Sequence, residues 1–189
     1  MKSKFLESKE KYDGAQLQSL RNYLTHGMLG DSIVAWAGAC DVSFEHMVDG
    51  EDLLENASIA SDKMLHFIIE KFDVSLFSAV SLQRLFAGVV KDQLMVLAKN
   101  KALALTLTRD GDDLYCGKKK LSVSIATQSP VNSLIHFAVN ITNEGTPVPT
   151  VSLEDLQVAP EILAIEVMSL FCREVETIQI ATHKVRWVK

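Results

Sequence analysis

The feature of this sequence with the clearest chemical use is a lysine that follows an acidic turn. Lys120 comes seven residues after Asp113, which closes the segment Arg109-Asp110-Gly111-Asp112-Asp113. A protein that brings a carboxylate and a phosphate together needs a fixed ammonium group, because it lowers their repulsion and stabilises the charge that develops in the transition state. Lys120 is therefore a candidate catalytic residue, and Asp113 a candidate ligand-binding residue at the pocket mouth.

The residues after Lys120 alternate between polar and apolar. Successive side chains of a strand point to opposite faces, so Ser122 and Ser124 share the predicted face of Lys120 and are candidate ligand-binding residues. The other face is apolar and predicts a core: Leu121, Val123 and Ile125. A second interpretation stays open, in which residues 118–120 are a solvated hairpin turn and the serines face water, since any half-buried strand alternates in this way.

The next predicted strand supplies two further candidates, His136 and Asn140. They lie four residues apart and so share one face, and an Asn side chain can both donate and accept hydrogen bonds in a pocket. We expect them beside Lys120, provided that the strand register aligns the two polar faces, because a slip of one residue would turn one set away. The alternative is that His136 is a satisfied structural group.

Cys40 is the best thiol candidate, because it follows a predicted strand in the segment Gly38-Ala39-Cys40-Asp41, where a loop residue meets solvent. As a nucleophile it would need a nearby cation, such as Lys120 or His66, to lower its pKa. The alternative is a small buried hydrophobe at a strand end, which is the commoner state of a free cysteine.

Asp62, His66 and Glu70 recur every four residues beside an apolar stripe. On a helix their side chains would meet and could orient a base or bind a metal, although such a series is more often a solvated helix edge. No HExxH or paired CxxC spacing occurs, so no metal site is predicted. His66 and Asp31, which opens the first predicted strand, complete the candidate ligand-binding residues.

Several helices and strands must position these candidates. Residues 31–37 read as a buried strand, Ser61 as the cap of a helix ending near Asp73, and residues 76–99 as a long helix. Predicted strands follow at residues 103–108, 114–116, 121–127 and 134–142, then a capping box at Ser152 and Asp155, a helix at residues 161–177 with Pro160 in its first turn, and a strand at residues 184–188. Helices grouped apart from a strand meander predict an α+β fold, with helices covering one face of a mainly antiparallel sheet.

Composition narrows the class of protein. The chain has 189 residues, 48% hydrophobic and 23% charged, which favours a single globular domain spanning residues 1–189. No apolar run reaches the roughly eighteen residues that cross a membrane, and the N-terminus lacks a signal-peptide pattern, so we expect a cytoplasmic protein without membrane contacts. A net charge of −5 disfavours nucleic-acid binding, and three widely spaced cysteines favour reduced thiols. The sequence does not fix the oligomeric state, and a homodimer is compatible with it.

Over nearly its whole length the chain resembles an uncharacterised prokaryotic group, the domain-of-unknown-function family 366. The resemblance rests on these segments: Leu29-Gly30-Asp31-Ser32-Ile33-Val34, Cys40-Asp41-Val42, Asp62-Lys63-Met64-Leu65-His66-Phe67-Ile68, Gly111-Asp112-Asp113-Leu114-Tyr115, Lys120 to Thr127 and Ser129-Pro130. More distantly, the core at about residues 76–142 resembles the biotin and lipoate protein ligases and octanoyltransferases. That resemblance implies a fold related to class II aminoacyl-tRNA synthetases.

It also implies a function. A carboxyl-activating ligase or acyltransferase would use Lys120 to position an anionic or carboxylate substrate, with ATP as a candidate cosubstrate and Cys40 as a candidate acyl acceptor. The alternative is a non-catalytic module that binds a small anion or a protein partner in the same pocket. The chain departs from the ligases in having Val123 where they usually have a glycine three residues after the lysine, which narrows the approach of a ligand to the backbone. Their Arg/Gly-rich loop is also not recognisable here.

Overall fold

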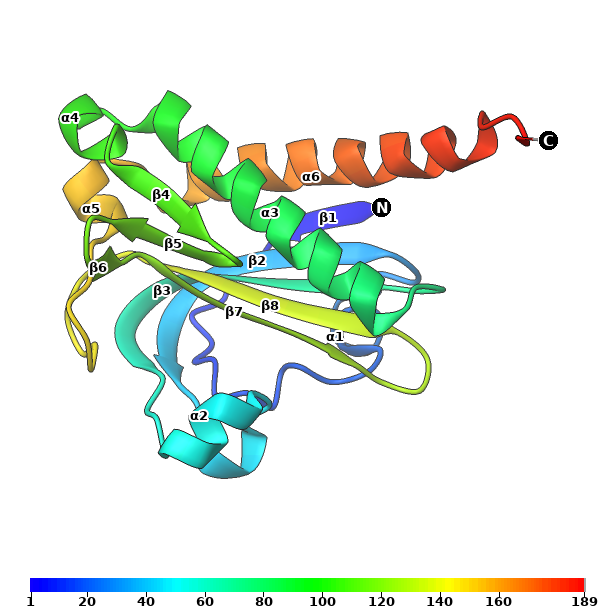
Figure 1. The fold of residues 1–189 in the computed structure, drawn as a ribbon. Coiled ribbons are helices and arrows are strands. Elements are labelled where there is room, and N and C mark those ends of the chain that lie inside the picture. The colour runs from blue at the N-terminus through cyan, green and yellow to red at the C-terminus, as the bar shows by residue number, and fades with distance from the viewer. Residues whose placement is uncertain (189) are drawn as a thin grey trace.

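A five-stranded sheet forms the centre of the computed structural model, which describes residues 1–188 (Figure 1). Its strand order is β1 (Lys2–Phe5), β2 (Ser32–Asp41), β3 (Ala60–Lys71), β8 (Ser133–Asn140) and β7 (Ser122–Gln128). The β1–β2 pair is parallel and the other three pairs are antiparallel. A second sheet is built from β4 (Leu107–Asp110), β5 (Asp113–Cys116) and β6 (Lys119–Lys120). β7 is thus an edge strand of the main sheet.

Two long helices, α3 (Leu76–Leu97) and α6 (Pro160–His183), cover one face of the main sheet (Figure 1). Phe86 of α3 is the centre of this core, because its ring meets Phe67, Phe137 and Phe171 edge-on at centroid distances of 5.1, 5.2 and 5.0 Å. Such edge-to-face pairs stabilise beyond the burial of their area. The short helices α4 (Lys101–Ala104) and α5 (Leu153–Leu156) flank the end of this layer.

The opposite face of the sheet is covered by irregular chain and short helices. A second cluster of buried side chains forms here around Tyr12, Trp36 and Met64. Figure 1 places α1 (Arg21–His26) and α2 (Gly50–Glu55) on this side of the sheet. Because less secondary structure covers this face, it is the face on which a cavity forms.

The α+β class with helices on a mainly antiparallel sheet is confirmed. So are the long helix at α3, the strands at β5, β7 and β8, and the closing helix, which runs on to His183. Ser152 and Asp155 form the predicted capping box, and Pro160 opens α6. These features depend on neighbouring residues, which is why local patterns suffice to find them.

The predicted helix capped by Ser61 is wrong, because residues 60–71 form the central strand β3. Its apolar residues fit a helical stripe, but β3 is buried on both faces between β2 and β8, and a strand of that kind is apolar throughout. Asp62, His66 and Glu70 therefore point to one face at intervals of about 13 Å and do not converge.

Three other boundaries differ from the prediction. β2 extends to Asp41, so Cys40 lies inside the strand and not in a loop after it. Residues 103–108 are not a strand of the main sheet, because they include the end of α4 and the start of β4 in the second sheet. Residues 184–188 form no strand. A segment with alternating polar and apolar residues forms a strand only where the free edge of a sheet is available to pair with it.

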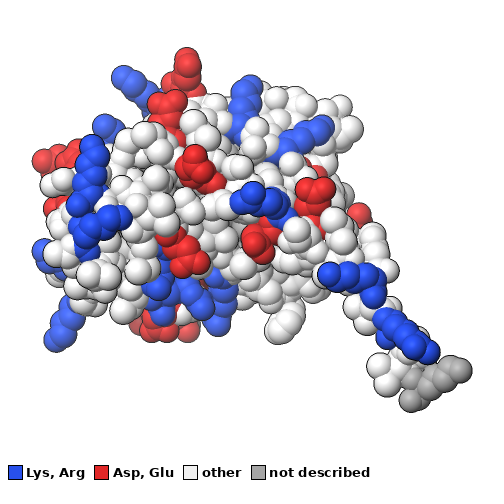
Figure 2. All heavy atoms as spheres, turned by 90° about the horizontal axis from the view of Figure 1, so that it is seen from above, with Lys and Arg blue, Asp and Glu red and all other residues white. Residues whose placement is uncertain are grey.

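Lysine, arginine and acidic side chains are interspersed on the helical face seen from above, without a large field of one sign (Figure 2). Within residues 1–188, no helix combines the length and the apolar character that crossing a membrane requires.

Candidate functional site

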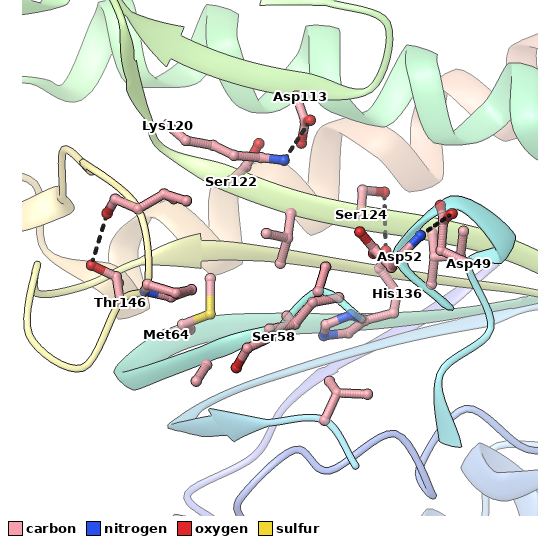
Figure 3. Close-up of a pocket in the computed structure, with 18 of the residues that line it drawn as sticks. Asp49, Asp52, Ser58, Met64, Asp113, Lys120, Ser122, Ser124, His136 and Thr146 are labelled. Carbon is pink, nitrogen blue, oxygen red and sulfur yellow. Dashed lines mark hydrogen bonds and ion pairs between the residues drawn. The ribbon is translucent and has the colours of Figure 1, made fainter. Parts of the chain in front are cut away.

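A cavity of about 440 Å³ opens beside the edge strand β7. Its lining comes from several parts of the chain: Tyr12 and Val42, the residues around α2, strand β3, the β4–β5 turn, Lys120 of β6, strands β7 and β8, and the loop at residues 146–150. Figure 3 shows Lys120 and Asp113 on one side, Met64, Ser58 and His136 on the opposite side, and Asp49 and Asp52 at one end. Segments that are far apart in the sequence therefore meet at one concave site.

Lys120 and Asp113 form an ion pair at this cavity, with 2.7 Å between Nζ and Oδ2 (Figure 3). The side chains are 32% and 24% exposed, so water screens the pair only partly. Burial raises the pKa of the Asp113 carboxyl against the opposing effect of the lysine. Burial lowers the pKa of Lys120, but its hydrogen bond and charge contact with Asp113 outweigh this, so that pKa lies above 10.5. The ammonium thus stays charged at neutral pH.

The backbone of Lys120 is fixed by three hydrogen bonds. Its N–H donates to Pro149 O at 3.0 Å, and its carbonyl accepts from Val151 N at 3.1 Å. Asn140 Nδ2 also donates to that carbonyl at 3.2 Å. Asn140 lines the cavity, and its amide group holds the main chain of Lys120 and so acts on the site through it.

Four further carboxylates line the cavity: Asp49, Glu51, Asp52 and Asp112. Asp49 caps α2 by accepting from the N–H groups of Glu51 and Asp52. Burial, and then the charge of Asp49, raise the pKa of Asp52. Lys120 is the only lysine or arginine among the lining residues of the described chain, so acidic groups surround one cation. Sequence reasoning missed this cluster, although Asp49-Gly50-Glu51-Asp52 is a recognisable helix start.

The predicted orientation of β7 is wrong. The register pairs Val123 with Ala138 and Ile125 with His136, whereas Ser124 is opposite Phe137 of the helical core. Directly opposed residues share a face, so Val123 and Ile125 lie on the cavity side of the sheet. The alternation is interrupted at Leu121, which belongs to neither β6 nor β7 and packs in the helical core. Parity counted from Lys120 therefore fails beyond this break.

Ser122 and Ser124 reach the cavity from the edge of β7, yet both hydroxyl groups have protein partners. Ser122 Oγ accepts from Leu114 N at 2.9 Å. Ser124 Oγ donates to His136 O at 3.0 Å and accepts from Gln83 Nε2 at 2.8 Å. These serines thus connect β7 to the second sheet and to α3, and their role as ligand contacts stays a prediction.

His136 lines the cavity and is 3% exposed, whereas His66 lies behind it and is fully buried. His66 Nδ1 is 3.2 Å from His136 Nε2, and Tyr12 stacks on His136 with 3.6 Å between ring centroids. Burial lowers the pKa of His66 to about 4, and burial followed by the proximity of His66 lowers the pKa of His136 well below 6.5. Both rings are neutral at pH 7.

Cys40 is 2% exposed and is not among the cavity-lining residues. Its predicted exposure in a loop is wrong, because it lies in β2, paired with Ser61 of β3 and bridged to Tyr12. Burial, and then the charge of Asp41, raise the pKa of the thiol to about 12. A nucleophilic thiol requires the opposite shift.

Asp31 lies outside the cavity lining. Its carboxylate pairs with Lys71 at 2.7 Å and accepts from Phe72 N at 2.9 Å, so it joins the ends of β2 and β3. Within residues 1–188, no three His, Cys, Asp or Glu side chains gather in a way that could hold a metal ion.

Comparison with known proteins identifies relatives over the whole chain. The model of a family described as "Domain of unknown function (DUF366)" matches residues 1–186. An uncharacterised protein of Methanocaldococcus jannaschii is 33% identical over 158 residues, which are 80% of this chain and 69% of that protein. A solved structure of a protein of unknown function from Pyrococcus horikoshi is 36% identical, has a TM-score of 0.90, and covers 99% of this chain and 100% of its own.

More distant structures share the fold. A lipoate-protein ligase A bound with ATP superimposes with a TM-score of 0.55 at 15% identity, covering 93% of this chain and 86% of that one. Biotin protein ligases match similarly, with a TM-score of 0.57 for one example. The chain therefore has a biotin/lipoate ligase-like fold, as the sequence resemblance implied.

Proposed function

Because the chain belongs to the family described as Domain of unknown function (DUF366), whose description names no activity, we propose a function from the pocket itself. The protein binds a small carboxylic acid, or an acyl group derived from one, with its carboxyl end at Lys120. The observation that carries this proposal is the half-buried ammonium of Lys120, the only lysine or arginine on the described cavity wall, paired with a single carboxylate.

An incoming carboxylate would compete with Asp113 for the same ammonium. Charge-assisted hydrogen bonds of this type are stronger than neutral ones, and partial burial strengthens them further. Asp113 suits such an exchange, because burial already raises its pKa and so disfavours its charged form. In a carboxyl activation or acyl transfer, Lys120 would then stabilise the negative charge that develops on the reacting carboxyl oxygen.

The apolar part of the ligand would lie along the cavity floor. Val123 and Ile125 face the cavity from β7, and Met64 faces it from β3. Burying apolar surface against them adds roughly 25 cal/mol for each Å² removed from water. The register of β7, with its apolar residues toward the cavity, thus favours a ligand with an apolar body over a bare inorganic anion.

The same pocket does not fit the triphosphate of ATP. Asp113 and the four other carboxylates would face a polyanion, and like charges at short range repel. We therefore assign no step to ATP. The buried Cys40 likewise does not suit a thioester intermediate, so we assign it no role as acyl acceptor.

Isothermal titration calorimetry with octanoate, lipoate and biotin tests the binding step. Lys120→Met should weaken binding of the carboxylate that binds the wild type by at least about tenfold, because a hydrogen-bonded charge is lost. Lys118→Met is the matched control, since Lys118 is exposed on the same hairpin and does not line the cavity. Its affinity should equal that of the wild type.

Equal affinity of Lys120→Met and wild type for these acids, or no binding of any of them, would refute the proposal. The non-catalytic alternative is separated by a second assay. Binding that depends on Lys120, without acyl transfer to an amine or thiol acceptor, would favour the binding module over the enzyme.

A further inference from the structure

His136, which lines the cavity, and the fully buried His66 behind it form a directional chain of hydrogen bonds. His66 Nε2 lies 3.2 Å from the carbonyl oxygen of Gly38, and His66 Nδ1 lies 3.2 Å from His136 Nε2. Tyr12 and Trp36 stack against the faces of His66 at centroid distances of 5.4 and 5.0 Å. The rings are therefore held in place by packing as well as by hydrogen bonds.

The carbonyl of Gly38 determines where the protons of both rings reside. A carbonyl oxygen only accepts, so His66 Nε2 must carry the proton and donate it. In a neutral ring His66 Nδ1 is then a bare acceptor, which requires a proton on His136 Nε2. The His136 ring is also neutral, because it is buried. Since its one proton is on Nε2, its Nδ1 carries none.

His136 Nδ1 has no hydrogen-bond partner among residues 1–188. The wholly buried side-chain atoms without a partner are Asn22 Oδ1, Ser61 Oγ and Thr142 Oγ1, and His136 Nδ1 is not one of them. The His136 residue is only 3% exposed, and the open space that it borders is the cavity. An unpaired acceptor in such a place is costly unless a ligand or water satisfies it.

We propose that His136 Nδ1 is a specificity-determining hydrogen-bond acceptor, which selects ligands that carry an N–H or O–H donor. His66 is a positioning residue, because it fixes the tautomer of His136 through Gly38. Asn140, which contacts the Lys120 backbone, lies four residues from His136 along β8, on the order of 13 Å. The main chain of Lys120 and His136 therefore lie at different positions along the cavity, and we expect the donor on a part of the ligand other than its carboxyl group.

This inference deepens the proposed function and, for the carboxyl end, rests on it. A plain hydrocarbon tail would cover the acceptor and leave it unpaired, whereas an amide, urea or hydroxyl group would satisfy it. Sites built around a polar group reject analogues that lack the matching partner more strongly than apolar pockets reject an added group. The ligand class is therefore a carboxylic acid that also carries an N–H or O–H donor outside its carboxyl group, rather than a simple fatty acid.

Nitrogen-15 NMR of the full chain, labelled in its histidines and kept at neutral pH, tests the tautomers directly. We expect a proton on Nε2 of both rings and an unprotonated Nδ1 on His136. The probe is 2-pyrrolidinone, a five-membered ring with one N–H, and the matched control is cyclopentanone, which has no donor. The first should shift the His136 Nδ1 resonance upfield, toward the hydrogen-bonded position, and the second should leave it unchanged.

Variants separate the roles of the residues. His66→Phe removes the acceptor for His136 Nε2 and should mix the two tautomers of His136. His66→Gln can accept from His136 and donate to Gly38, so it should restore the single tautomer. In Lys120→Met the response to 2-pyrrolidinone should persist. Failure of carboxylate binding is thus distinguishable from failure of the acceptor.

Three results would overturn the inference: a proton on His136 Nδ1, no shift with 2-pyrrolidinone up to the highest concentration at which the protein stays folded, or equal shifts with both probes. An unchanged tautomer in folded His66→Phe would remove the positioning role of His66. Should His66→Phe fail to fold, the wild-type titration with the two probes still decides whether the acceptor exists.

Discussion

Gln83 of α3 donates a hydrogen bond from Nε2 to Ser124 Oγ of the edge strand β7 at 2.8 Å. The same amide nitrogen donates to Asp112 Oδ2 of the β4–β5 turn, also at 2.8 Å, and Gln83 is 4% exposed. One buried side chain thus connects the helical layer, the edge of the main sheet and the turn that precedes Asp113. The position of Asp113 depends on a helix residue that does not line the cavity.

Gln83→Ala should lower the free energy of unfolding by about 1–3 kcal/mol, because two partly buried acceptors lose the donor that the buried Gln83 amide supplies. Urea denaturation measures this effect. Gln93→Ala is the matched control, since Gln93 lies on the same helix, is partly exposed, and has no side-chain hydrogen bond within the described chain. Its change should stay within about 0.5 kcal/mol. Equal effects of the two substitutions would show that the Gln83 contacts contribute nothing specific.

Asp113→Asn should lower the pKa of Lys120. Burial alone lowers this pKa, and the hydrogen bond and charge of Asp113 are the main opposing influences. Carbon-13 NMR titration of the lysine Cε resonance reports the change, with Asp110→Asn on the same turn as the control. A pKa of Lys120 that rises or stays constant in Asp113→Asn would contradict the ion pair as the dominant influence.

Cys40 should be alkylated more slowly than Cys172 at neutral pH. Cys172 is partly exposed on α6, whereas Cys40 is buried and its pKa is raised to about 12. Compared with a thiol whose pKa is 9.0, Cys40 has about a thousandfold smaller fraction of thiolate at neutral pH. Mass spectrometry after timed iodoacetamide treatment gives the order. Rapid modification of Cys40 in the folded protein, with a rate that depends on Lys120, would instead restore the acyl-transfer hypothesis.

Stability should decrease as pH falls from 6.5 toward 4 because of His66. The unfolded imidazole has a pKa near 6.5 and the folded one near 4, so the unfolded state binds more protons in this window. The difference corresponds to about 3 kcal/mol for this residue alone. The pH dependence of urea unfolding should be shallower in His66→Gln than in wild type. His183→Gln, an exposed position on α6, should behave as wild type.

Gly38→Ala should destabilise the protein by about 1–3 kcal/mol, because a Cβ at this position would overlap the carbonyl oxygen of Glu10. Gly88→Ala is a control of opposite sign, since a Cβ there meets nothing within 4 Å and the residue lies inside α3. It should stabilise the helix by up to about 1 kcal/mol. Thermal unfolding distinguishes the two. A neutral Gly38→Ala would mean that the segment at Glu10 moves away freely.

The sequence by itself determined the features that depend on neighbouring residues. The long helix α3, the capping box at Ser152 and the β4–β5 turn follow from periodicity and turn chemistry within a few residues. The pairing of Lys120 with Asp113 belongs to the same class, because the two residues lie only seven positions apart on one hairpin. The contacts of these residues do not depend on the position of any segment that is distant in sequence.

Tertiary structure decided the rest. Alternation shows that a strand has two different faces, but not which face meets the helices, so the orientation of Ser124 and Val123 was set only by pairing with β8. A doubly buried strand carries no alternation, so β3 resembled a helix. His66 and His136 are 70 residues apart, and their contact exists only because β3 and β8 are neighbours in the sheet. Burial of Cys40 likewise follows from the chain at Tyr12 that covers it, since exposure is a property of the packed molecule and not of a local pattern.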